Sequence, residues 1–116
     1  QRVLPKVCSG EWVGCMAMSE PDYGTDVLGM KTKAERIDDG SWSITGRKMW
    51  ITNGTLDDQR TPADCVLLYA RTGTDAKGRA QISTFLVEKD HPWATGFWNS
   101  AGYQLHESMS RYLRDI

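Results

Sequence analysis

The sequence predicts a mostly β protein, arranged as a small antiparallel barrel or sandwich. Short apolar or alternating segments recur along the chain, turns rich in glycine and aspartate separate them, and no long helical pattern lies between them. Because the exposed edges of so small a sheet invite pairing with other chains, we expect the sheet to be closed or covered. A length of 116 residues suits one domain with a modest core.

The first three predicted strands come before residue 47. Residues 13–19 are small and apolar, which is typical of a short buried strand. Residues 31–37 are more polar and predict an edge strand, and residues 41–46 alternate, with their Trp and Ile on one face. Asp38-Asp39-Gly40 lies between these two segments, and an Asp-Gly pair supplies the positive φ angles of a tight turn. We therefore expect a β-hairpin here.

The later strands follow the same reasoning. Residues 48–52 predict a short strand that ends at Asn53-Gly54, and residues 55–64 form a polar loop. Residues 65–71 are almost continuously apolar, as in a buried strand, and residues 81–87 predict its partner across a turn-rich segment. These last two strands should form a second hairpin.

The carboxyl end has a different pattern. Apolar residues recur there at helical spacing, which predicts an amphipathic helix from about residue 103. Packing of this helix against the sheet is favoured over a role in binding a partner. We divide the chain into residues 1–12, a remnant of a preceding helical domain or a linker; residues 13–90, the β-domain; and residues 91–116, a divergent segment.

Composition narrows the function classes. The net charge of −1 argues against a nucleic-acid partner, and no apolar run reaches the length of a membrane span. Three cysteines without a CxxC pair argue against a disulfide framework and favour a reducing compartment. We expect no metal site, because the two histidines lie far from the cysteines in the sequence.

Two polar strings could carry chemistry. In the first, residues 16–29, a small apolar run leads into a turn with Gly24 and Thr25. Such a turn can hold an anion on its N–H groups and hydroxyls, although hydrogen bonds within the turn are the favoured interpretation from physics alone. In the second, residues 48–54, Trp50 and Thr52 would share one face of a strand and could contact a flat ring. A core tryptophan is the favoured alternative there.

Taken together, the two strings resemble the middle domain of the acyl-CoA dehydrogenases. The family pattern of small, aliphatic, Ser/Thr, Glu, then Gly, Ser/Thr, Asp is matched from Ala17 to Gly29, and Trp-Ile-Thr-Asn-Gly is present at Trp50 to Gly54. The resemblance covers roughly residues 1–90 and is nearest to the isovaleryl-CoA and related short branched-chain enzymes. It implies a small antiparallel β-barrel that binds FAD and acyl-CoA.

The resemblance also implies roles for individual residues. The cofactor-binding set would be Met16, Ala17, Met18, Ser19, Gly24, Thr25, Trp50, Ile51 and Thr52, with Thr25 facing the substrate thioester as well. Residues 16–18 would run beside the isoalloxazine, Trp50 would cover one of its faces, and Ser19 and Thr52 would hydrogen-bond its edge. No residue here would be catalytic, because the family's glutamate base belongs to a carboxyl-terminal helical domain. We therefore expect the chain alone to be inactive.

The same resemblance implies partners and a location. An acyl-CoA substrate, an electron-transfer flavoprotein and a homo-oligomer are expected, in the mitochondrial matrix of a eukaryote or otherwise in the cytoplasm. Tyr23 departs from the family pattern, which has a small residue there, and could crowd the cofactor or point to solvent. The alternatives are a non-catalytic β-barrel that binds an oligonucleotide or carbohydrate, and the equivalent domain of an acyl-CoA oxidase.

Overall fold

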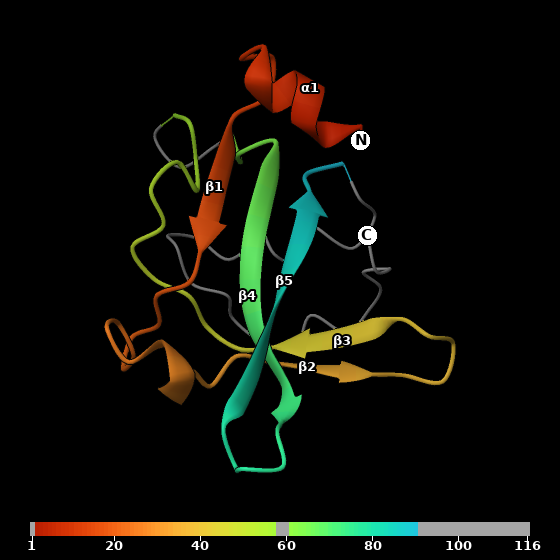
Figure 1. Cartoon of the computed structure of the whole chain (residues 1–116). Helices are drawn as coiled ribbons and strands as arrows, with labels where there is room; N and C mark the ends of the chain where they lie inside the picture. The colour runs from red at the N-terminus through yellow and green to blue at the C-terminus, as the bar shows by residue number, and fades with distance from the viewer. Residues whose placement is uncertain (1, 58–60, 91–116) are drawn as a thin grey trace.

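A computed structural model describes residues 2–57 and 61–90 of the chain. Within these residues, five strands and two short helices follow one another (Figure 1). They are α1 (Val3–Cys8), β1 (Gly14–Ala17), the 3₁₀ helix η1 (Val27–Gly29), β2 (Lys33–Arg36), β3 (Trp42–Thr45), β4 (Cys65–Thr74) and β5 (Ala80–Glu88). Neither α1 nor η1, the two helices of the described part, has the length or the apolar character that crossing a membrane requires.

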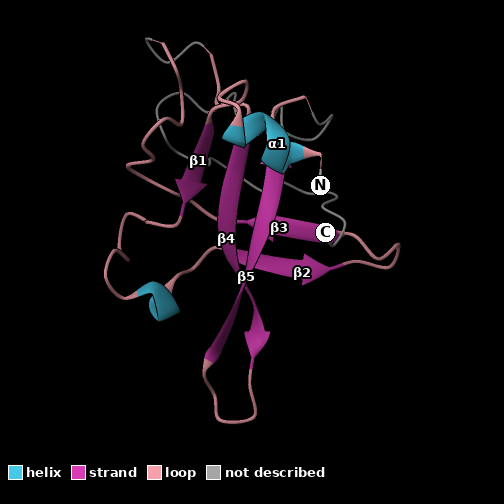
Figure 2. Ribbon diagram, turned by 45° about the horizontal axis from the view of Figure 1, so that its top comes forward, coloured by secondary structure: helices cyan, strands magenta, loops and turns pink. Residues whose placement is uncertain are grey.

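Strand β4 is the centre of the sheet. Strand β1 runs parallel to its first half, and β5 runs antiparallel along its whole length, from the Cys65–Glu88 pair to the Thr74–Ala80 pair. Strand β2 meets β4 at one parallel pair, Lys33 with Arg71, and carries β3 on its other side. Figures 1 and 2 show the β2–β3 hairpin projecting sideways from the far half of β4.

The prediction of a closed antiparallel barrel is wrong for the described residues. The sheet is open, because β1 pairs only with β4 and β3 pairs only with β2, and it is mixed. The parallel pairing is set where β1 and β4 begin: the Asp64 carboxylate accepts a hydrogen bond from Val13 N at 2.8 Å, and Asp64 N donates to Val13 O at 2.9 Å. The predicted carboxyl-terminal helix lies outside the described residues.

Both predicted hairpins are confirmed. Gly40 has a φ of 81° in the turn between β2 and β3, and its N–H donates to Ile37 O at 2.9 Å. Gly78 has a φ of 78° in the turn between β4 and β5, where its N–H donates to Asp75 O at 2.9 Å. Left-handed backbone of this kind is readily adopted by glycine, which has no Cβ to clash with the carbonyl oxygen.

Two strand predictions need correction. Residues 48–52 form no strand, because Trp50 and Asn53 have left-handed φ angles of 56° and 60° that turn the chain. Trp50 and Thr52 therefore do not share a strand face. The segment predicted as an edge strand forms β2, which is flanked by β3 and β4. The pattern of apolar and polar residues indicates which face of a strand is buried. It does not indicate which strands pair with it, because that depends on contacts between residues distant in the sequence.

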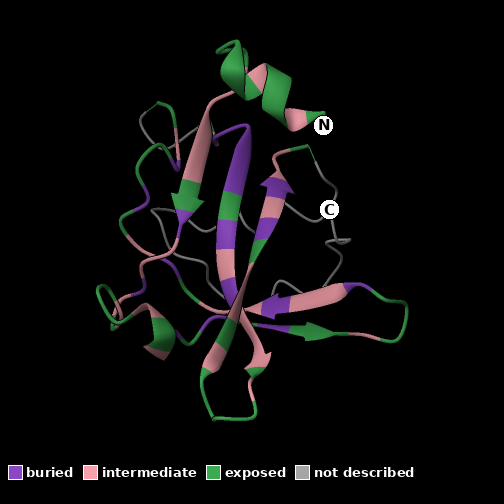
Figure 3. Ribbon diagram, in the orientation of Figure 1, coloured by how far each residue is buried: buried purple, intermediate pink, exposed green. Residues whose placement is uncertain are grey.

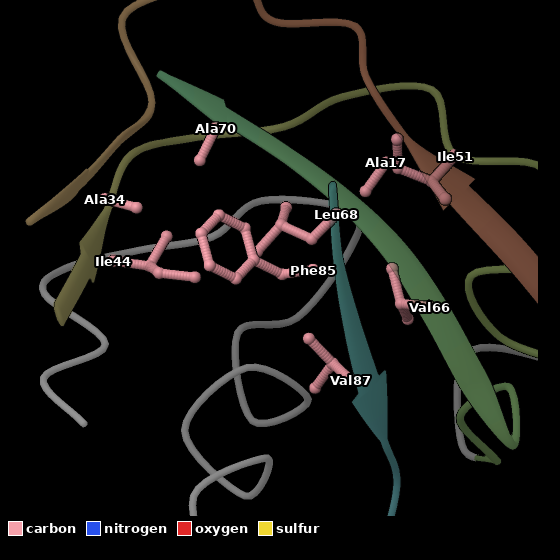
Figure 4. Packing of buried hydrophobic residues seen from close by; sticks show 9 residues of the cluster. All are labelled: Ala17, Ala34, Ile44, Ile51, Val66, Leu68, Ala70, Phe85 and Val87. Atoms are coloured by element: carbon pink, nitrogen blue, oxygen red, sulfur yellow. The ribbon is translucent and has the colours of Figure 1, made fainter. Parts of the chain in front are cut away.

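The core lies on one face of the sheet, where side chains from all five strands and from Ile51 meet (Figure 4). Figure 3 marks the buried parts of these strands. Its members are Ala17, Ala34, Ile44, Ile51, Val66, Leu68, Ala70, Phe85 and Val87. Trp42 packs its ring edge-on against Phe85, with 5.6 Å between the ring centroids. Beside the sheet, Gly46 closely approaches Thr32, so that a Cβ at Gly46 would lie 2.5 Å from Thr32 Cα.

Candidate functional site

The two polar strings lie side by side in the structure. Met49 N donates a hydrogen bond of 2.9 Å to Ser19 O, and the Lys48 ammonium donates one of 2.9 Å to Met18 O. In Figure 1 the chain after β3 passes beside the end of β1, where the first string begins. The structure thus brings residues 18–20 next to residues 48–50.

A buried ion pair joins the strings. Lys48 Nζ lies 3.0 Å from Glu20 Oε1, and the two residues are only 1% and 3% exposed. Burial alone would raise the pKa of Glu20, but hydrogen bonding from Thr32, Lys31 and Lys48 outweighs it and holds that pKa below its ordinary value. Burial lowers the pKa of Lys48, and the neighbouring carboxylate opposes this shift only in part.

Glu20 also fixes the segment that enters β2. Its two carboxylate oxygens accept hydrogen bonds from Lys31 N at 2.6 Å and from Thr32 N at 2.9 Å. The Met30 sulfur lies 3.8 Å from the Lys48 ammonium. The glutamate therefore joins three separate segments, and a carboxylate satisfied by so many donors is suited to a structural role.

Lys48 is the residue that sequence reasoning missed. A lysine between an arginine and a methionine in a polar string gives no sign of burial, since lysines are almost always exposed. Buried carboxylates are paired with cations or satisfied by hydrogen bonds, but this rule helps only where burial of the carboxylate can be recognised. Nothing in the local sequence of Glu20 indicated that it would be buried.

Trp50 is exposed rather than buried. Its side chain is 70% accessible, and its φ of 56° places a bulky residue in the left-handed region. The core-tryptophan interpretation is therefore wrong. The adjacent Ile51 is 9% exposed and belongs to the core cluster, where Figure 4 shows it near Ala17. The turn at Trp50 thus directs the indole outward and the next side chain inward.

Other residues of the predicted cofactor set divide between surface and core. Met16 is 53% exposed, whereas the side chain of Ala17 is fully buried in the core cluster. Ser19 and Met18 are half-buried, and Gly24, Thr25 and Thr52 are exposed. The hydroxyls of Ser19, Thr25 and Thr52 have no hydrogen-bond partner within residues 2–57 and 61–90. These hydroxyls, with the exposed indole and thioether, can contact a ligand, whereas Ala17 and Ile51 can do so only through their backbones.

The turn of the first string satisfies part of its own polar groups. The Asp26 carboxylate accepts a hydrogen bond from Gly29 N at 3.2 Å and caps η1, while Val27 N donates to Thr25 O at 3.0 Å. The turn therefore contains the internal hydrogen bonds that the residue types alone favoured. The exposed Gly24 and Thr25 side remains open to a ligand, so the two interpretations of the turn are compatible.

A groove of about 310 Å³ lies elsewhere, between β2 and the far half of β4. Lys33, Glu35, Arg71 and Thr72 are among the side chains that line it. None of the predicted site residues does so.

Comparison with known proteins identifies relatives. The family described as "Acyl-CoA dehydrogenase, middle domain" matches residues 15–115, a range that includes most of the segment set apart as divergent. The mitochondrial isovaleryl-CoA dehydrogenase of Arabidopsis thaliana is 46% identical over 84% of this chain and 21% of its own. The mitochondrial 2-methylacyl-CoA dehydrogenase of Solanum tuberosum is 44% identical over 79% of this chain and 20% of its own.

A solved structure has the same fold. Glutaryl-CoA dehydrogenase from Mycobacterium smegmatis, in complex with FADH2, is 38% identical with a TM-score of 0.61, over 77% of this chain and 20% of that one. The chain thus spans about a fifth of the length of the curated relatives that it matches. Because the family match covers most of the sequence and the relatives agree with it, this chain belongs to the acyl-CoA dehydrogenase family and corresponds to its middle domain.

Proposed function

We propose that this chain is the FAD- and acyl-CoA-binding middle domain of an acyl-CoA dehydrogenase, which desaturates an acyl-CoA thioester between Cα and Cβ. The observation that carries the proposal is the outward indole of Trp50, held by a left-handed backbone next to Ser19 of the first string. A large aromatic side chain at 70% exposure offers a stacking surface that packing within the chain does not use.

The residues present fit a flavin. The exposed Trp50 indole would cover one face of the isoalloxazine, and Met16 and Met18 would run along the ring. The free hydroxyls of Ser19 and Thr52 would hydrogen-bond its polar edge. Bound FAD would supply the hydride acceptor for the desaturation, while these residues would bind and orient it.

The exposed turn fits the remaining groups. Gly24 and Thr25 would face the pyrophosphate, where a glycine without a side chain permits close approach of the backbone. The Thr25 hydroxyl would also face the thioester. Lys48 and Glu20 would not contact the ligand, because both are buried and satisfied by each other and by backbone groups. Their role would be to hold the two strings at the spacing that the ring requires.

The names of the relatives support a proposal for the substrate, and the partners are proposed from the family resemblance. Those with 46% and 44% identity are named for isovaleryl-CoA and 2-methylacyl-CoA, which supports a short branched-chain acyl-CoA as the substrate. An electron-transfer flavoprotein would reoxidise the cofactor of the complete enzyme, which would be a homo-oligomer. The mitochondrial relatives support the matrix as its location in a eukaryote, and the cytoplasm is proposed for a bacterial source.

Titration of FAD into the full chain, followed by flavin fluorescence, tests the proposal. We expect weak but saturable binding at high protein concentration, because a fifth of an enzyme offers a fraction of the contact surface. Trp50→Ala should weaken binding about tenfold, the upper range of an aromatic stacking energy. Trp12→Ala is the matched control, since Trp12 lies under Lys6 near α1. Absence of binding by the wild type, or equal loss in both variants, would contradict the proposal.

A further inference from the structure

Tyr23 lies inside the turn that carries the proposed ligand contacts. Its backbone makes reciprocal hydrogen bonds with Glu20: Glu20 N donates to Tyr23 O at 2.9 Å, and Tyr23 N donates to Glu20 O at 3.3 Å. Glu20 is itself buried and fixed by Lys48. The backbone of Tyr23 is therefore tied to a rigid part of the structure, two residues before Thr25.

The Tyr23 ring closes the turn from the other side. It lies against the backbone of Gly29, so closely that a Cβ at Gly29 would be 2.5 Å from Tyr23 Cε1 and 2.6 Å from Cδ1. The Lys31 ammonium lies 5.3 Å from the ring centroid, at a distance suited to a cation–π contact. The ring is thus held between a glycine and a cation, and Tyr23 is half-buried.

Between these anchors, Gly24 and the side chain of Thr25 have little to fix them. Both are exposed, and nothing lies within 4 Å of where a Cβ at Gly24 would be. Glycine loses more conformational freedom on ordering than any other residue. A contact that orders this pair before the ligand arrives would reduce the entropy lost on binding.

We propose that Tyr23 is a positioning residue, whose ring holds the 20–29 loop closed against Gly29 and Lys31 and so orders Gly24 and Thr25 for the ligand. The inference rests on the proposed function and deepens it. The Tyr23 ring is directed toward Gly29 rather than freely to solvent. With the ring held there, Tyr23 would support the site instead of crowding the cofactor, which was the other outcome that the sequence left open. It acts through Thr25 and does not itself contact substrate or cofactor.

Three variants of the full chain test the inference: Tyr23→Ala, Tyr23→Phe and Leu28→Ala. Leu28 is the matched control, because it belongs to the same loop and is 60% exposed. The first measurement is hydrogen exchange, without ligand, of the loop amides that donate hydrogen bonds, namely those of Val27, Gly29 and Met30. Tyr23→Ala should exchange about tenfold faster than wild type, which corresponds to about 1.4 kcal/mol. Tyr23→Phe keeps the ring and should behave as wild type, as should Leu28→Ala.

The second measurement is FAD affinity, which should fall in Tyr23→Ala alone and be restored in Tyr23→Phe. Unchanged exchange in β4 would show that Tyr23→Ala is folded. Equal loop exchange in Tyr23→Ala and wild type would overturn the inference, and so would faster exchange with unaltered FAD affinity. Failure of the wild type to bind FAD would instead refute the proposed function, whereas the exchange comparison would still decide whether Tyr23 orders the loop.

Discussion

Lys48→Met should destabilise the folded chain far more than the removal of one surface charge would. The substitution leaves Glu20, which is 3% exposed, without a cation. At 3.0 Å and an effective dielectric constant of about 20, the attraction that is lost amounts to about 5 kcal/mol. The two backbone donors from Lys31 and Thr32 remain and compensate in part. We expect a loss of about 3 kcal/mol in the free energy of unfolding, the lower end for breaking a buried pair.

The double variant Glu20→Gln with Lys48→Met separates the energy of the ion pair itself from that of each residue with its surroundings. It removes both charges, and the methionine side chain can pack against Met30, which already contacts the Lys48 ammonium. Replacement of a whole buried pair by neutral groups is often tolerated. The double variant should therefore be more stable than the sum of the single changes predicts, with a coupling energy of about 1–3 kcal/mol.

Urea unfolding monitored by tryptophan fluorescence measures these energies, since the chain contains five tryptophans. Lys6→Met is a suitable control, because Lys6 lies in a solvent-exposed pair with Glu11 at 3.4 Å and its loss should change stability by less than about 1 kcal/mol. A loss below about 1 kcal/mol in Lys48→Met, or additive single and double variants, would refute the reasoning.

The same pair predicts a pH dependence. Because the pKa of folded Glu20 lies below its ordinary value of 4.5, the unfolded chain binds a proton first as the pH falls. The stabilisation from Glu20 is complete above pH 4.5 and is lost as the pH falls through the folded pKa. The stability advantage of wild type over Glu20→Gln should accordingly shrink below pH 4.5. An advantage that stays constant through acid pH would contradict this assignment.

Three further predictions concern other residues. Gly46→Ala should lower the free energy of unfolding in urea by about 1–3 kcal/mol, because the new Cβ would clash with Thr32, just before β2. Gly24→Ala should not lower it, because a Cβ at Gly24 would have open space. Burial, with a smaller contribution from Cys65, raises the pKa of the Cys15 thiol to about 11. A thiol reagent at pH 8 should therefore label the exposed Cys8 first and Cys15 only on unfolding. Finally, Trp50→Gly should be about 1 kcal/mol more stable than Trp50→Ala, because glycine accepts the left-handed backbone.

Local chemistry made several elements predictable. The hairpin turn at Asp38-Asp39-Gly40 was evident because few residues other than glycine accept a φ of 81°. The apolar run that forms β4 and the segment that forms β5 were predicted to within a few residues. In each case the determining interaction lies between neighbours in the sequence, so the pattern of residues was sufficient.

Other features depend on contacts between distant residues. Side chains alternate between the two faces in parallel and antiparallel strands alike, so the sequence pattern does not distinguish them. The parallel pairing of β1 with β4 is set by the hydrogen bonds between Asp64 and Val13, which are far apart in the chain. The strand prediction at residues 48–52 fails for the same reason, because the Met49 N–H bonds to Ser19, far away in the sequence, and the backbone turns at Trp50. Proximity of the two strings was expected only from the family resemblance, and burial of Lys48 was not expected at all.

The structure explains why Trp50 is held outward at an energetic cost. An L-residue in the left-handed region is less stable by about 1–2 kcal/mol, and a largely exposed indole gains little from burial in return. The neighbours on either side enforce the turn: Lys48 is anchored by Glu20, and Ile51 is packed in the core. These contacts account for the backbone conformation, but they leave the indole without apolar burial. The flavin proposed to stack on the indole would remove that apolar area from water and so offset part of the cost of the strained backbone.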